Sequence, residues 1–199
     1  VLFRSDITWA STCCFFARRE VVIEAGGFEP VYFAYAEEID LSLAICRLGY
    51  RIQSFPRVNV YHFGGWSWDK KKPFKTFLLH RNFLILFLKC LPTGSLLRHL
   101  PGRILLELIS IFFYVIKGEP RLVWSVWRSH LAVIRLLPYI FRQRRNFFAK
   151  PSRGTALIYN KSIIISHYIW KKRSFNQLDT SNFSGVKDPL RIDGNPSRN

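Results

Sequence analysis

The chain has 199 residues, enough for one ordinary domain or for part of one with an appendage. Its formal net charge of +17 suits nucleic acid, anionic lipid or a phosphorylated substrate as a partner. The four cysteines show no C-x-x-C pair and no Cys/His cluster of zinc spacing, which argues against a zinc module, and we expect them to be reduced and buried. The sequence starts at Val1 and contains no Met, so we expect a fragment whose upstream part is missing.

The positive charge is concentrated beyond residue 69. Residues 1–69 contain 6 Lys/Arg and 8 Asp/Glu, whereas residues 70–173 contain 21 Lys/Arg and only two acids. The basic residues alternate with long apolar stretches such as 111–116, which favours a membrane surface over nucleic acid. The composition predicts three regions: residues 1–69, a basic and apolar helical region over 70–173, and a polar, disordered tail over 174–199.

Local patterns predict the elements of the first region. In chain order they are a buried strand over 8–17, a short helix over 18–26, an aromatic loop over 28–36, a helix over 37–48, and strands over 50–55 and 58–62. The strands follow from β-branched, aromatic or alternating apolar residues, and the helices from apolar residues at helical spacing. Gly26 and Gly49 mark helix ends, and three acids in the first turn of the second helix complement its dipole.

Prolines divide the basic region after residue 70. Because proline disrupts a helix interior, we expect about four helices, separated at Pro92, Pro101, Pro120 and Pro138. The longest apolar run, 104–116, covers about 13 residues, short of the roughly 20 that cross a bilayer. The sequence therefore predicts interfacial helices bound peripherally to the cytoplasmic face of a membrane, rather than a transmembrane span.

Several short motifs follow one another over about residues 8–68. They are G-G-F-E-P at 26–30, Y-A-E-E-I-D-L-S-L at 35–43, G-Y-R-I at 49–52 and a histidine at 62. Their order and spacing resemble the C-terminal part of family 2 glycosyltransferases with the A-type fold, particularly bacterial rhamnosyltransferase-like members. The resemblance implies an α/β fold: the second half of a nucleotide-sugar transferase domain, followed by membrane-associated amphipathic helices.

The resemblance also implies site residues. The second acid of the family's Glu-Asp pair is the usual catalytic base, and that position is Glu38, where a Glu in place of Asp is a departure that adds one methylene. In several relatives a His at the position of His62 helps to bind the metal. The Mg²⁺ or Mn²⁺ is held mainly by an upstream D-x-D motif, and no D-x-D occurs in this chain. Candidates for substrate binding are Glu37, Gly27, Tyr35 and Arg81.

These candidates also have structural interpretations. Glu37 and Glu38 can complement the dipole of the helix without any catalytic role, and Gly27 can simply end a helix. The guanidinium of Arg81 matches diphosphate oxygens in a bidentate manner, but a basic residue on a basic helix is often simply solvated. His62 is equally an ordinary residue at the end of a strand.

The sequence predicts an inverting sugar transferase that acts in cell-envelope polysaccharide synthesis. It would move a sugar from a nucleotide-sugar donor to a glycan or polyprenyl-linked glycan acceptor, with a divalent cation bound mainly by the missing upstream half. The fragment alone is expected to be inactive. The alternative is a non-catalytic, membrane-bound remnant or partner subunit that lacks the donor-binding half. Nucleic acid is not an expected partner.

Overall fold

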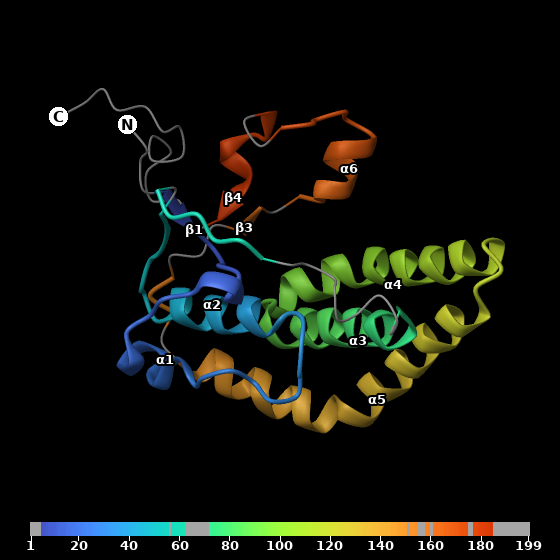
Figure 1. Ribbon diagram of the computed structural model, residues 1–199, viewed down its shortest axis with the longest axis horizontal. Coiled ribbons are helices and arrows are strands. Elements are labelled where there is room, and N and C mark those ends of the chain that lie inside the picture. Colours follow the sequence, from blue (N-terminus) through green and yellow to red (C-terminus); the bar gives the residue numbers. More distant parts are fainter. Residues whose placement is uncertain are drawn as a thin grey trace. The chain divides into compact units, whose positions relative to one another are not determined.

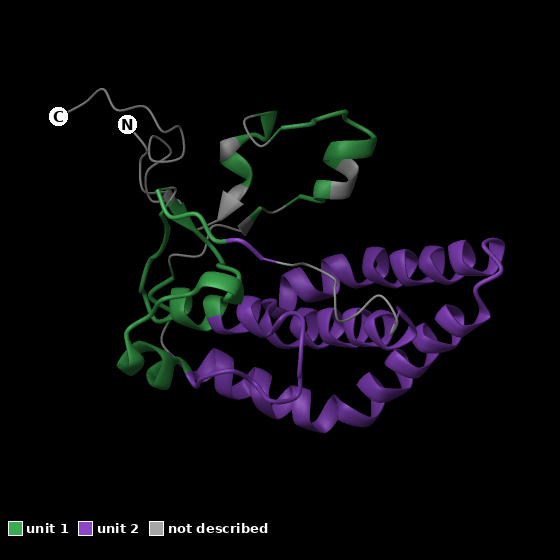
Figure 2. Cartoon of the chain, in the orientation of Figure 1, with its two compact units in different colours: residues 1–25, 42–60, 151–199 green, residues 26–41, 61–150 purple. Residues whose placement is uncertain are grey.

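The structure is a computed structural model that describes residues 5–55, 57–62, 72–150, 152–154, 158–159, 161–174 and 177–184. These residues are mainly helical, and their strands form two separate two-stranded sheets (Figure 1). The chain divides into two compact units (Figure 2): residues 1–25, 42–60 and 151–199 form unit 1, and residues 26–41 and 61–150 form unit 2. This division does not follow the charge boundary at residue 69. The predicted domain limits and α/β class stay predictions.

Unit 1 contains the short elements near both ends of the chain. They are β1 (Ser5–Ile7), η1 (Thr12–Cys14), α1 (Arg19–Ala25), β2 (Ile52–Ser54), β3 (Ile158–Tyr159), α6 (Ile163–Tyr168), η4 (Thr180–Asn182) and β4 (Phe183–Ser184). β1 pairs antiparallel with β2, so that Ile7 lies opposite Ile52, and β3 pairs antiparallel with β4. Helix α2, Glu37–Arg47, begins in unit 2 and ends in unit 1.

The predictions for the first region are confirmed at α1, α2 and β2 and are wrong for two strands. In place of the strand over 8–17, the Ser11 hydroxyl accepts a hydrogen bond from the Cys13 amide at 3.4 Å and caps η1. This local hydrogen bond competes with the hydrogen bonds to a neighbouring strand that a β-strand would need. Residues 57–62 form no strand, and Val58 and Val60 are exposed.

Two further predictions are wrong in part. All four cysteines are free, and Cys46 is buried, but Cys13 and Cys14 are exposed because they lie in η1 at the surface. Within the tail predicted to be disordered, residues 180–184 form η4 and β4, since β4 pairs with β3. Residues 175–176 and 185–199 of the predicted tail lie outside the described residues.

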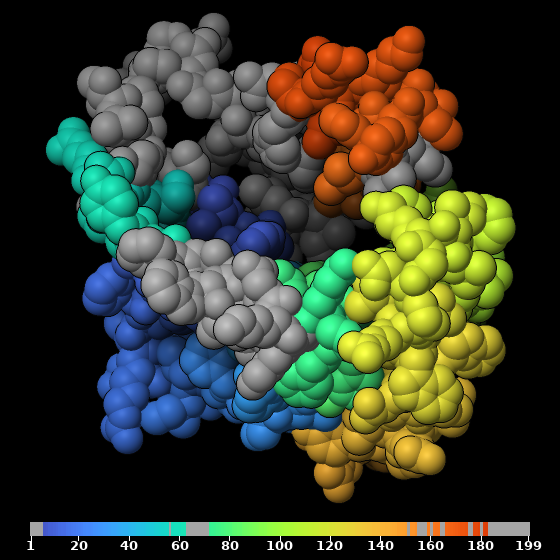
Figure 3. Space-filling model, turned by 45° about the vertical axis from the view of Figure 1, so that its right-hand side comes forward, coloured from blue at the N-terminus to red at the C-terminus, as the bar shows by residue number. Residues whose placement is uncertain are grey.

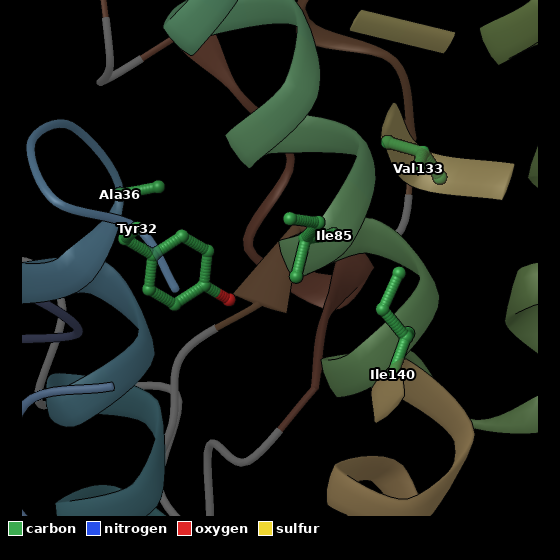
Figure 4. Packing of buried hydrophobic residues seen from close by; sticks show 5 residues of the cluster. All are labelled: Tyr32, Ala36, Ile85, Val133 and Ile140. Carbon is green, nitrogen blue, oxygen red and sulfur yellow. The ribbon is translucent and has the colours of Figure 1, made fainter. Parts of the chain in front are cut away.

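Unit 2 is built on three long helices, α3 (Lys72–Cys90), α4 (Thr93–Ile116) and α5 (Pro120–Ala149). α3 packs mainly against α5, and α4 contacts both (Figure 1). The buried cluster in Figure 4 joins Ile85 of α3 and Val133 and Ile140 of α5 to Tyr32 and Ala36. Burying a large apolar side chain stabilises a fold by about 1.5–3 kcal/mol. The segment before α2 is therefore fixed on the α3–α5 pair.

Pro101 and Pro138 lie inside α4 and α5, so the prediction that they separate helices is wrong. A proline removes one backbone hydrogen bond but leaves the rest of the helix intact. Around Pro138, packing offsets this cost because Val133 before it and Ile140 after it are both buried. Since α4 continues through Pro101, it reaches 24 residues. By length and composition, it is the one described helix that can cross a bilayer.

Candidate acid site at the start of helix α2

The chain enters α2 through left-handed backbone. φ is 63° at Phe33, 69° at Tyr35 and 75° at Ala36. This conformation costs a residue with a side chain roughly 1–2 kcal/mol, because its Cβ crowds the following carbonyl oxygen. None of the three is Gly, Asn or Asp, the residues that adopt it most readily. Such backbone persists only where surrounding contacts hold it, and it is concentrated at functional sites.

Two adjacent side chains of α3 hold this segment by its carbonyl groups. Asn82 is fully buried. Its amide nitrogen donates to the carbonyl oxygens of Tyr32, Ala34 and Tyr35 at 2.8, 2.6 and 2.9 Å. The Arg81 guanidinium donates to two carbonyl oxygens of the same segment, at 2.8 and 3.1 Å. The shape of residues 31–36 is therefore set by α3.

Arg81, a predicted substrate-binding residue, has a positioning role in this arrangement. Besides the two carbonyl groups, its Nε donates to Asn82 Oδ1 at 2.9 Å, and its guanidinium carbon lies 5.2 Å from the ring centroid of Phe77. Burial lowers the pKa of Arg81, but a guanidinium remains charged at neutral pH. Binding of a substrate phosphate by Arg81 stays a prediction.

Glu37 and Glu38 directly follow the left-handed segment and open α2, and both are half-buried. The Oε2 atom of each carboxylate is buried and has no hydrogen-bond partner among the described residues. Burial raises the pKa of Glu37; its own backbone N–H opposes the rise, and the nearby Glu38 carboxylate adds to it through its charge and a side-chain hydrogen bond. Unpaired acceptor oxygens at the positive end of a helix can receive the hydrogen bond, or the proton, of a hydroxyl group.

Replacement of Glu37 by glutamine is expected to change stability in a pH-dependent way. Because folding raises the pKa of Glu37 above its ordinary 4.5, the folded chain binds this proton more tightly than the unfolded chain. Ionisation of Glu37 therefore destabilises the fold as the pH rises from that value through the folded pKa. Urea unfolding between about pH 3 and pH 7 should show Glu37→Gln gaining stability relative to the parent across this window. A difference that stays flat or falls with pH contradicts the burial of Glu37.

One turn further along α2, Asp40 belongs to a buried ionic cluster. Lys89, near the end of α3, donates to Asp40 at 2.7 Å and to Glu29 at 3.3 Å. The Cys90 thiol donates to the second oxygen of Asp40 at 3.2 Å, and the Tyr139 hydroxyl donates to Glu29. Burial works to lower the pKa of Lys89, but the charge and hydrogen bond of Asp40, together with the charge of Glu29, outweigh this effect and raise that pKa. This cluster ties the first turns of α2 to the end of α3.

The thiol and the phenol of this cluster stay protonated. Burial, reinforced by the Asp40 charge, raises the pKa of Cys90 well above its ordinary value. Burial and the hydrogen bond to Glu29 raise the pKa of Tyr139 to about 12. Both groups are hydrogen-bond donors at neutral pH, so neither acts here as nucleophile or base.

The sequence signal for these partners lies in the spacing of α3. Its buried residues include Leu78, Asn82, Ile85 and Lys89, which are 4, 3 and 4 positions apart and share one helix face. A polar side chain on a buried face must find partners inside the protein. The sequence interpretation missed Asn82 and Lys89 because it assigned this region to a basic surface.

Three predicted ligands remain, namely His62, Gly27 and Tyr35. The His62 side chain is exposed, and no three His, Cys, Asp or Glu side chains gather to hold a metal in the part of the chain that the structure describes. Gly27 has a φ of 72° and open space around a Cβ position, so only its backbone conformation demands glycine. Tyr35 is half-buried within the left-handed segment. The ligand roles of these three residues stay predictions.

Unit 1 contains a separate hollow with a volume of about 840 Å³. Apolar and aromatic side chains such as Trp9, Phe15 and Ile45 line it. None of the predicted site residues contributes to its wall. The acid site and this hollow are therefore distinct features.

Comparisons with known proteins supply no relative for this chain: no family model, curated protein or solved structure matches it. The resemblance to family 2 glycosyltransferases accordingly depends on the motifs in the sequence, and the function has to be argued from the acid site itself.

Proposed function

We propose that this chain carries the acceptor-side segment of an inverting sugar transferase in which Glu38 is the general base. The observation that supports the proposal is the pair of half-buried carboxylates at the start of α2, each with a buried oxygen that has no partner among the described residues. Leaving a buried acceptor unpaired costs about 1–3 kcal/mol. The hydroxyl of a bound sugar would satisfy it.

The proposed reaction transfers a sugar from a nucleotide-sugar donor to a glycan or polyprenyl-linked glycan. Glu38 accepts the proton of the acceptor hydroxyl as its oxygen attacks the anomeric carbon. The bond from that carbon to the diphosphate breaks, and its electron pair leaves with the nucleoside diphosphate. Attack opposite the leaving group inverts the anomeric configuration.

Glu37 has a complementary part in this proposal. Since burial and Glu38 raise its pKa, Glu37 keeps its proton to a higher pH than an ordinary carboxyl and can donate a hydrogen bond to a sugar oxygen. Glu37 would therefore orient the acceptor while Glu38 removes its proton.

The divalent cation that the resemblance implies finds no complete ligand set among the described residues. His62 alone does not make a metal site, because Mg²⁺ and Mn²⁺ prefer several oxygen ligands. No step of the proposed reaction depends on a metal bound by this chain.

The test is sugar transfer by the full-length gene product, measured with a panel of nucleotide sugars. Glu38→Gln, which cannot accept the proton, should lower kcat/KM by about a hundredfold or more. Glu38→Asp should retain more activity than Glu38→Gln because it keeps a carboxylate. Glu20→Gln is the matched control, since Glu20 is an exposed acid in the first turn of α1, and it should leave kcat/KM unchanged.

Two results would overturn the proposal. One is full activity in a folded Glu38→Gln variant, which would show that another group removes the proton. The other is the absence of turnover by the full-length protein with every donor. That outcome would favour the alternative, a non-catalytic membrane-bound partner.

A further inference from the structure

Helix α4 shows the reverse of ordinary amphipathic burial. Its one buried residue is Glu107, while most of its large apolar side chains are exposed. Ile104, Leu105 and Leu106 are consecutive and all exposed. Successive residues of a helix point about 100° apart, so this apolar surface covers roughly 200° of the circumference. A single packing partner normally covers a stripe only about 100° wide.

The carboxylate of Glu107 is enclosed by basic side chains from all three helices of unit 2. His80 of α3 lies 2.5 Å from Glu107 Oε2, and Arg103 of α4 donates to Oε1. His130 of α5 lies 3.6 Å from Oε2. An acid within hydrocarbon is tolerated when it faces other helices and is paired there. The outer surface of α4 therefore presents no acid over residues 93–116.

Helix α5 places positive charge beside an exposed apolar stripe. Four of its exposed arginines recur every seven residues, at Arg121, Arg128, Arg135 and Arg142. Its exposed apolar residues include Trp124, Trp127, Leu131 and Ile134. A seven-residue repeat drifts only about 20° per step, so the arginines form one row along the helix. α5 contains no acid, and such a helix suits an anionic lipid surface.

We propose that α4 inserts into the hydrocarbon layer of an anionic bilayer and that the arginine row of α5 binds lipid phosphate groups. α4 enters the hydrocarbon with its exposed apolar surface, while α5, which contacts α4, keeps its arginine row at the level of the lipid phosphate groups. The end of α4 and the beginning of α5 form an uncovered surface in Figure 3. Bilayer hydrocarbon fits an apolar surface this wide better than a second copy of the chain. This insertion goes beyond peripheral binding and does not depend on sugar transfer.

The test is flotation of the full-length gene product with vesicles of phosphatidylcholine, either alone or mixed with phosphatidylglycerol, followed by an alkaline carbonate wash. The parent should float with the anionic vesicles and resist the wash. The double variant Ile109→Lys/Phe112→Lys, in exposed positions of α4, should lower the wash-resistant fraction by about tenfold or more. The matched control, Phe16→Lys/Ile23→Lys, changes the same residue types at exposed positions outside α4, and it should behave like the parent.

Circular dichroism in detergent establishes that each variant keeps its helices. Complete release of the parent by carbonate would overturn insertion, as would a double variant that remains as resistant as the parent. Equal binding to neutral and anionic vesicles would overturn the role of the arginine row. A dimer that forms without lipid and dissociates in the double variant would assign the surface to a second copy of the chain.

Discussion

Replacement of Lys89 by methionine is expected to lower the free energy of unfolding by about 3–5 kcal/mol. The ammonium is the cation that neutralises Asp40 and Glu29 within the cluster, at 2.7 and 3.3 Å. Methionine has a similar volume but no charge, so the variant leaves two carboxylates in a buried site without a counter-ion. Breaking a buried ion pair by removing one partner costs this much because the remaining charge stays desolvated. Urea unfolding followed by circular dichroism measures the loss.

The chain offers a matched control for this substitution in the same helix. Lys72, the first residue of α3, forms an ion pair with Glu119 at 3.1 Å, but both side chains are largely exposed. Lys72→Met should change the free energy of unfolding by no more than about 1 kcal/mol, because solvent screens an exposed pair. Equal effects of the two substitutions would mean that Lys89 is not enclosed as described.

The second large effect is expected at Asn82. Asn82→Asp keeps the shape of the side chain but replaces its N–H donors with an oxygen that faces the carbonyl groups of Tyr32, Ala34 and Tyr35. Buried carbonyl groups that lose their donor cost about 1–3 kcal/mol each, so we expect a loss of roughly 3 kcal/mol or more. In the full-length gene product, release of the left-handed segment should also reduce any activity that depends on Glu38.

Asn146→Asp is the control for this change, since Asn146 is an exposed asparagine on α5. It should leave the free energy of unfolding within about 0.5 kcal/mol of the parent, as surface substitutions usually do. If Asn82→Asp is equally mild, residues 31–36 hold their conformation without α3.

The start of α2 could be predicted because its determinants are local. The acids of the first turn and the glycine after the last turn are read directly from neighbouring residues. The fate of residues 8–17 could not be predicted, because a hydroxyl cap competes there with strand-forming side chains. The prediction of helix ends at Pro101 and Pro138 was wrong for another reason. Whether a helix continues through a proline depends on packing contacts with residues far away in the sequence.

The sequence indicated which acids form the candidate site, but it did not indicate which contacts hold the segment before them in place. Motif order singled out Glu37 and Glu38, and the structure gives each an unpaired buried oxygen among the described residues. Arg81 was a candidate for phosphate binding because of its guanidinium geometry, with simple solvation as the alternative, and its phosphate role stays a prediction. Its partners are backbone carbonyl groups 49 and 50 positions earlier, and backbone groups leave no trace in a sequence pattern.

The dependence of residues 31–36 on α3 has a consequence for protein engineering. The shape of this segment is not encoded by its own residues, because its left-handed backbone is held by Asn82 and Arg81 from another helix. If residues 31–38 alone were grafted into another scaffold, they would lose the left-handed backbone conformation. The carboxylates of Glu37 and Glu38 would then no longer be held in fixed positions. A transplantable unit has to include the turn of α3 that contains residues 81 and 82.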